Sequence, residues 1–132
     1  MNYLDLDITE VRQLIKDKKV TSTQLVKECF ARIKQTEDLN ALNSVYEKMA
    51  LNRAREIDEL ISKGKDVGVL GGVPIVIKDN INMIGTTTTC SSNFLKNYVS
   101  PYNATVVQKL LDAGAVIIAK ANMDEFAMGS SN

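Results

Sequence analysis

Two short apolar runs, both rich in β-branched residues, constrain the fold of this chain most strongly. The first covers residues 73–77 and the second covers residues 115–119. Apolar runs of this length are typical of strands that are buried on both faces. Pro74 has no N–H to donate to a sheet ladder, so we expect it at the beginning of the first strand. The helical segment between the two runs predicts a β-α-β crossover with parallel strands.

That intervening helix has recognisable ends and an apolar face. We expect Asn103 to cap it and Gly114 to end it. The residues expected to face the core are Val106, Val107, Leu110 and Leu111.

Three amphipathic helices are predicted before the first strand. Asp7 with Glu10, and Thr21 with Gln24, have the spacing of capping boxes and indicate where the first two helices begin. These helices should run to about residue 18 and about residue 36. A third helix is predicted over residues 48–62, with Lys63 and Gly64 as its stop. Residues 40–46 between the second and third helices are expected to form a turn and then a brief extended stretch.

The composition excludes several classes of function. The chain has 132 residues, which suits one domain, and its 16 basic and 16 acidic residues cancel, so no net charge attracts nucleic acid or a membrane surface. It has no histidine, and Cys29 and Cys90 are too far apart to form a ligand pair, so no metal site is expected. Cys29 falls on an apolar helix face and is interpreted as a packing residue.

The same features suggest a compartment. Two cysteines do not make a disulfide framework, which favours a reducing, cytoplasmic location. The acidic N-terminus and the absence of a long apolar run argue against a signal peptide and a membrane span.

Lysines end both predicted strands. Lys78 follows the first apolar run and Lys120 follows the second. Because the carboxyl ends of parallel strands meet at one edge of a sheet, where ligands commonly bind, the two lysines are candidates for one site. From the residues alone, Lys78 is either a lysine that extends its amine to water or a functional group.

The connection from residue 79 to residue 103 is long and rich in Thr, Ser and Asn, above all at residues 86–93. Loops of this length tend to be functional or mobile. The hydroxyls could border a pocket, or they could satisfy the backbone of their own turns. Both interpretations stay open at this point.

Three segments together resemble the amidase signature family. They read GGVPIVIKDNI at residues 71–81, LNALNSV at residues 39–45, and SPYNATVVQKLLDAGAVIIAKANMDEFAMGSSN at residues 100–132. Within that family, the ending NMDEFAMGSSN is typical of glutaminase subunits of tRNA-dependent amidotransferases. The resemblance implies an α/β fold in which helices pack on a mixed β-sheet. It also implies one partial domain over residues 1–132, with a helical lead-in at 1–63 and the start of the amidase core at 64–132.

The resemblance implies a Ser–cis-Ser–Lys catalytic set in which Lys78 is the lysine. A neutral Lys78 would accept a proton, through a bridging serine, from a serine that attacks an amide carbonyl. Burial would favour this role, because desolvation lowers the pKa of a lysine. The GGSSGG-like segment that carries the bridging serine does not occur here, and Ser130 and Ser131 precede it in the family. We therefore expect a chain truncated before its catalytic serines and inactive by itself, the N-terminal piece of a longer protein.

Other site residues follow from the same comparison. Met128, Gly129 and Ser130 are expected to line the substrate pocket, with simple loop structure as the alternative. Asp79 and Asn80 are expected to support Lys78 or to cap the turn after it. Lys120 is interpreted as structural within this family.

The implied partners are the B- and C-type subunits of an amidotransferase complex, with glutamine as ammonia donor and Glu-tRNA(Gln) as acceptor. No cofactor is expected in this chain, because ATP and Mg²⁺ would be used by a partner subunit. Two other functions stay open: a stand-alone amidase acting on small amides, and a truncated, non-catalytic interaction module.

Overall fold

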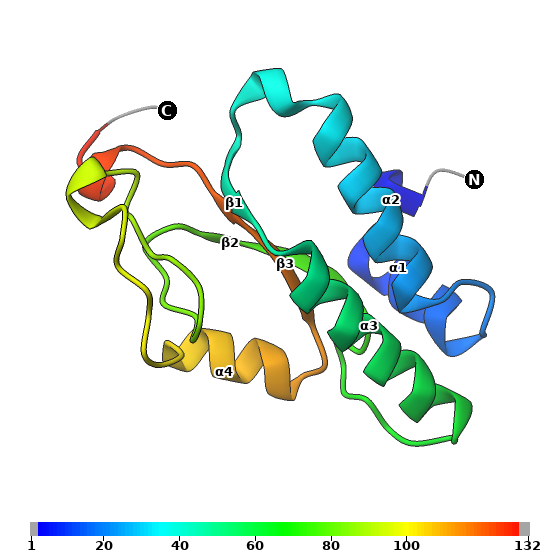
Figure 1. Ribbon diagram of the computed structural model, residues 1–132. Helices are drawn as coiled ribbons and strands as arrows, with labels where there is room; N and C mark the ends of the chain where they lie inside the picture. The colour runs from blue at the N-terminus through cyan, green and yellow to red at the C-terminus, as the bar shows by residue number, and fades with distance from the viewer. Residues whose placement is uncertain (1–2, 130–132) are drawn as a thin grey trace.

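The computed structural model describes residues 3–129, which form a three-stranded sheet with helices on both faces (Figure 1). The strands are β1 (Leu42–Val45), β2 (Pro74–Lys78) and β3 (Val116–Ala121). β3 lies in the centre, parallel to β2 and antiparallel to β1. The predicted α/β class with a mixed sheet is confirmed, and Pro74 begins its strand as expected.

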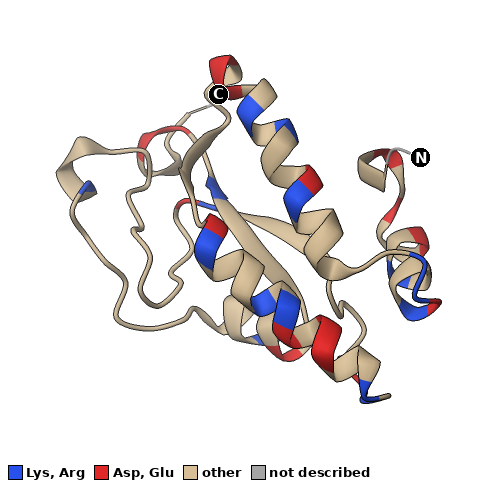
Figure 2. Ribbon diagram, turned by 45° about the vertical axis from the view of Figure 1, so that its right-hand side comes forward, with Lys and Arg blue, Asp and Glu red and all other residues tan. Residues whose placement is uncertain are grey.

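Four α-helices of the described chain surround the sheet: α1 (Ile8–Lys16), α2 (Ser22–Gln35), α3 (Glu47–Ser62) and α4 (Thr105–Asp112). α2 and α3 cover one face and α4 covers the other (Figure 1). Acidic and basic residues are interspersed along α1, α2 and α3 (Figure 2). Within residues 3–129, no helix has the length and apolar character needed to cross a membrane. Short 3₁₀ turns complete the chain at Tyr3–Asp5, Glu37–Leu39, Asn93–Leu95 and Glu125–Ala127.

The helix caps predicted from the sequence form, with one exception. Both predicted capping boxes form, before α1 and before α2. α3 ends at Ser62 with Lys63 as its C-cap, as expected. Asn103, however, does not cap α4, because the cap position is Ala104 and has no side-chain hydrogen bond. The Asn103 side chain instead accepts a hydrogen bond from the backbone N–H of Ile84, at 2.8 Å, and so ties the long loop to the start of the helix.

Three apolar clusters make up the core. One joins α2 and α3 to β3, a second lies between α1, α2 and the start of β2, and a third lies between the sheet and α4. Val107 is the fully buried residue of α4, whereas Val106, predicted to face inward, is 49% exposed. The buried members of the first cluster are Val26, Ala50, Ala54, Ile57, Val116, Ile118 and Ala119.

The two apolar runs differ in burial. β3 is buried along almost its whole length, as predicted for a strand covered on both faces. β2 is paired only with β3 in the described chain, and Val76 on it is 42% exposed. The prediction that residues 73–77 are buried on both faces is therefore wrong for residues 3–129. A run of β-branched residues indicates a strand, but it does not indicate whether that strand is central.

Gly114, directly after α4, provides a test of this packing. Its φ is +89°, and a Cβ there would stand 1.9 Å from the carbonyl oxygen of Val67 and 2.8 Å from the Cα of Gly71, both backbone atoms. We expect Gly114→Ala to lower the free energy of unfolding by more than about 3 kcal/mol, because the strained φ adds to a clash that rotamers cannot relieve. Urea unfolding followed by circular dichroism measures the change.

Gly64 is the matched control for that substitution. Its φ is +70°, but nothing lies within 4 Å of an added Cβ. Gly64→Ala should therefore cost only about 1 kcal/mol, the price of the left-handed conformation alone. Equal losses in the two variants would contradict the proposed backbone clash.

Cys29 packs beside the first cluster, which confirms its predicted packing role. Burial, and then the carboxylate of Glu28, raises the pKa of the Cys29 thiol from 9.0 to about 11. The thiolate is therefore scarce at pH 8. The contribution of the thiol to the free energy of unfolding is full below about pH 9 and is lost as the pH rises from about 9 to about 11. We expect iodoacetamide at pH 8 to alkylate Cys29 at least about tenfold more slowly in the folded protein than in urea. Peptide mass spectrometry gives both rates, and equal rates would contradict the raised pKa of Cys29.

Candidate active site at the carboxyl end of the sheet

Lys78 is the last residue of β2, and its side chain is exposed. Its carbonyl accepts a hydrogen bond from the N–H of Ile81 at 3.0 Å, which closes a tight turn in which Asn80 is also exposed. The buried surroundings predicted for the Lys78 amine are thus not formed by residues 3–129. Its catalytic role remains a prediction, as does the supporting role of Asn80.

Lys78 and Lys120 lie on opposite faces of the sheet. Lys78 pairs with Ala121, whereas Lys120 pairs with Ile77, the residue before Lys78. Successive side chains of a strand point to opposite faces, and paired residues share a face. The hypothesis that the two lysines form one site is therefore wrong.

An irregularity in β3 sets the direction of Lys120. Ile75 pairs with Ile117, but Val76 pairs with Ala119, so Ile118 is an extra residue in β3. Such a bulge reverses the alternation of the side chains that follow it. Lys120 consequently leaves the face covered by α2 and α3 and points to the face that carries α4 and the long loop.

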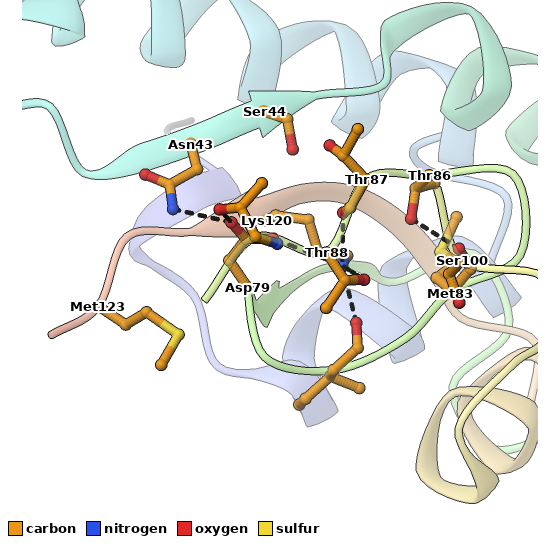
Figure 3. A network of polar contacts seen from close by, with 12 residues as sticks. Asn43, Ser44, Asp79, Met83, Thr86, Thr87, Thr88, Ser100, Lys120 and Met123 are labelled. Carbon is orange, nitrogen blue, oxygen red and sulfur yellow. Dashed lines mark hydrogen bonds and ion pairs between the residues drawn. The ribbon is translucent and has the colours of Figure 1, made fainter. Parts of the chain in front are cut away.

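The amine of Lys120 is completely buried and fully hydrogen-bonded (Figure 3). It donates to the carbonyl of Ile81 at 2.7 Å, the carbonyl of Thr87 at 3.1 Å and the hydroxyl of Thr88 at 3.0 Å. A lysine ammonium has three N–H donors, and each finds an acceptor here. The carboxylate of Asp79 completes the surroundings at 3.7 Å from the same nitrogen.

Asp79 follows Lys78 directly and is also completely buried. Its carboxylate accepts hydrogen bonds from the side-chain amide of Asn43 at 2.9 Å and from the hydroxyl and the N–H of Thr89. Its backbone is held as well, because its N–H donates to the carbonyl of Ala121 at 3.1 Å. Asp79 therefore joins the end of β2 to β1, to β3 and to the loop, a wider set of contacts than capping one turn requires.

Burial and charge act in opposite directions on the Lys120 amine. Burial lowers the pKa of Lys120 below its ordinary value of 10.5, and the neighbouring Asp79 carboxylate partly restores it. A buried amine without that carboxylate would favour its neutral form still more strongly. The ion pair with Asp79 therefore favours the charged form of Lys120 in the protein interior.

A second polar centre connects the residues that follow β3 to the long loop. The hydroxyl of Ser91 donates to the side-chain carbonyl of Asn122 at 2.8 Å and accepts from the N–H of Met123 at 3.1 Å. Nearby, the N–H of Cys90 donates to the carbonyl of Asp79, and the N–H of Phe126 donates to the carbonyl of Cys90. Residues 122–127 consequently lie at the same end of the sheet as Lys78.

The predicted pocket residues themselves are only partly described. Met128 is 77% exposed, and Gly129 packs so closely on Asp124 that a Cβ would stand 2.4 Å from the Asp124 carboxyl group. Ser130 lies outside the described residues. Their assignment to a substrate pocket remains a prediction. A surface cavity of about 690 Å³ lies elsewhere, between α1 and residues 61–69, and none of the predicted site residues lines it.

Four hydroxyls of the long loop have two roles, only one of which was predicted. Thr86 donates to the carbonyl of Met83 at 2.7 Å, and Ser100 donates to the carbonyl of Tyr102 at 2.7 Å, so these two satisfy their own turns. Thr88 (Figure 3) and Thr89 instead contact the buried ion pair. Neither role requires a pocket.

Sequence reasoning did not identify the partners of this network, Asn43, Thr88 and Thr89. One signal was available: Lys120 and Asp79 carry opposite charges at the ends of two strands predicted to be neighbours. Because a charge in an apolar strand needs a partner, the pair could have been predicted. The bulge that turns Lys120 toward Asp79 has no comparable signal in the sequence.

Comparisons with known proteins agree with this architecture. The amidase family profile matches residues 24–132. The chain is 50% identical over 129 residues to the A subunit of the mitochondrial glutamyl-tRNA(Gln) amidotransferase of Ornithorhynchus anatinus, covering 98% of this chain and 25% of that protein. It is 49% identical over 132 residues to the A subunit of the glutamyl-tRNA(Gln) amidotransferase of Thermoanaerobacter pseudethanolicus, covering 99% and 27%.

A solved amidase structure has a similar fold. The native peptide amidase of Stenotrophomonas maltophilia superimposes with a TM-score of 0.88 at 30% identity, over 94% of this chain and 26% of that one. The chain spans about a quarter of the length of the curated relatives it matches.

Proposed function

This chain belongs to the amidase family, and from that premise we propose that it is the N-terminal portion of the glutaminase subunit of a tRNA-dependent amidotransferase. The observation that carries the proposal is identity of about one residue in two to the A subunits of amidotransferases along almost the whole chain. The peptide amidase resembles this chain in fold but is only 30% identical to it. This difference favours the amidotransferase over a stand-alone amidase.

In the proposed reaction Lys78 is the general base. Its neutral amine takes a proton through a bridging serine, and a second serine forms a bond to the amide carbon of glutamine. The C–N bond then breaks, the proton passes back to the leaving nitrogen, and ammonia departs from a glutamyl-enzyme that water hydrolyses to glutamate. Both serines belong to sequence beyond Asn132. Met128, Gly129 and Ser130 contribute to the pocket for glutamine, and Asn80 supports the turn beside Lys78.

The ammonia serves partner subunits of the B and C types. One of them uses ATP and Mg²⁺ to activate the side-chain carboxyl group of Glu-tRNA(Gln), and the ammonia displaces the activating group to give the side-chain amide of Gln-tRNA(Gln). The proposed location is cytoplasmic, in keeping with the two unpaired cysteines of the chain. Several relatives are mitochondrial by name, so fractionation of the source cells is the appropriate test of compartment.

Co-expression of the full-length protein with B- and C-type subunits tests the assignment. We expect the three proteins to co-purify and to form Gln-tRNA(Gln) from Glu-tRNA(Gln), glutamine and ATP, with release of ammonia. A full-length protein that purifies alone and hydrolyses small amides efficiently would instead support the stand-alone amidase and overturn the proposal.

The 132-residue chain alone should release no ammonia from glutamine. The proposed mechanism needs a nucleophilic serine and a bridging serine, and a lysine cannot replace either of them in forming the acyl-enzyme. A coupled ammonia assay on the purified chain, with the full-length protein as positive control, measures this. Hydrolysis that persists through purification would contradict the assignment of the serines to later sequence.

A further inference from the structure

Lys120 has no part in the proposed chemistry, yet it is the largest completely buried side chain of the described residues. An ion pair in this position is not explained by stability alone. Replacing a buried pair with well-packed apolar residues is often neutral or stabilising, whereas buried ionic groups in some proteins fix one conformation among several. The contacts of Lys120 indicate which conformation is fixed.

Every hydrogen bond of the Lys120 amine, and its ion pair, goes to the segment that follows Lys78. The partners are the carbonyls of Ile81 and Thr87, the hydroxyl of Thr88 and the carboxylate of Asp79. These groups lie on residues 79–88, a stretch without a helix or a named strand. A single ammonium (Figure 3) thus contacts four groups of this loop, in addition to the hydrogen bonds that join the loop to residues 98–104.

Two of these contacts connect Lys120 to Lys78 through one intervening residue each. The N–H of Ile81 donates to the Lys78 carbonyl at 3.0 Å, and the Ile81 carbonyl accepts from Lys120 at 2.7 Å. On the other side, Asp79 is bonded directly to Lys78 and pairs with the same ammonium. Lys120 therefore holds both ends of the turn that begins at Lys78.

We propose that Lys120 is a positioning residue for Lys78: its buried ammonium, acting through Asp79 and the Ile81 carbonyl, fixes the turn after β2 and so aims the Lys78 amine from the opposite face of the sheet. This inference rests on the proposed function. It concerns kcat rather than glutamine binding, because Lys120 lies in the protein interior and does not line the end of the sheet where Lys78 emerges. A displacement of about 1 Å at a reacting group can cost about 100-fold in rate.

The test uses the full-length enzyme with its partner subunits. The variant Lys120→Met with Asp79→Asn removes both charges together and leaves no buried ion unpaired. We expect kcat for ammonia release from glutamine to fall about 100-fold, with KM for glutamine changed less than about twofold. A folded double variant with the kcat of the parent enzyme would overturn the proposal, as would a variant in which KM alone changes.

A milder pair of variants keeps the proposal falsifiable if the double variant does not fold. Thr88→Val removes one acceptor of the Lys120 ammonium, and Thr86→Val removes a buried hydroxyl of the same loop that bonds only to Met83. We expect a roughly fivefold lower kcat for Thr88→Val and an unchanged kcat for Thr86→Val, at similar thermal midpoints. Equal kcat values in the two variants overturn the proposal.

Lys78→Ala in the same assay separates this inference from the function on which it rests. An inactive Lys78→Ala enzyme beside a fully active double variant overturns the positioning role alone. An active Lys78→Ala enzyme overturns the proposed function and the positioning role together.

Discussion

Replacing Lys78 with alanine in the full-length protein is expected to lower the rate of glutamine hydrolysis by at least about 10³-fold, the scale of a lost general base within a catalytic set. The Lys78 side chain is exposed at the end of β2 in the described chain, so its removal should leave the fold unchanged. The loss should therefore appear in kcat, with an unaltered circular dichroism spectrum. The measurement is ammonia release at saturating glutamine.

Lys78→Arg distinguishes a base from a positive charge. A guanidinium stays protonated at any working pH and cannot accept the proton of a serine, so this variant should be as inactive as alanine. Lys96, exposed in the long loop, is the matched control, and Lys96→Ala should keep full activity. Substantial activity in Lys78→Arg would show that charge is sufficient and would remove Lys78 from its role as base.

A general base of this kind needs a neutral amine. Residues 3–129 do not form the buried surroundings that were predicted for the amine of Lys78. They leave the Lys78 side chain exposed. We propose that a segment outside residues 3–129 packs over the end of β2 and supplies the desolvation that the proposed mechanism needs. Val76, on the same face of β2 as Lys78 and 42% exposed, is the apolar surface against which such a segment can pack.

The fold was largely predictable because its signals are local. The capping boxes at Asp7 and Thr21 depend on residues three positions apart, and the stop at Gly64 depends on one backbone conformation. The crossover followed from two apolar runs with a helix between them. β1 was anticipated only as an extended stretch, since it has only four residues and its pairing with β3 is a long-range event.

The candidate site was predictable only in part, for a physical reason. The position of Lys78 at a strand end follows from the chain order, and Asp79 was expected to support it. The direction of Lys120 depends on the bulge at Ile118, and burial of Asp79 depends on a side-chain amide from β1. Such contacts join segments that are distant in sequence, and the periodicity of the sequence carries no signal for them.

Replacing Lys120 with methionine is expected to lower the free energy of unfolding by about 3–5 kcal/mol, a large share of the stability of a domain of this size. Methionine fills the space of the lysine chain without its charge. The cost arises because Asp79 is left completely buried without its cation, while the carbonyls of Ile81 and Thr87 lose their donor. Urea unfolding followed by circular dichroism measures the difference.

Two comparisons isolate the buried charge as the cause. Lys109→Met makes the same chemical change on the exposed side of α4 and should alter stability by less than about 0.5 kcal/mol. Adding Asp79→Asn to Lys120→Met removes the unpaired carboxylate and should restore at least about half of the loss, because an amide is far less costly to bury than an ion. If the double variant is instead less stable than Lys120→Met alone, the penalty lies in lost hydrogen bonds rather than in an uncompensated charge, and the ion pair is not what holds the loop.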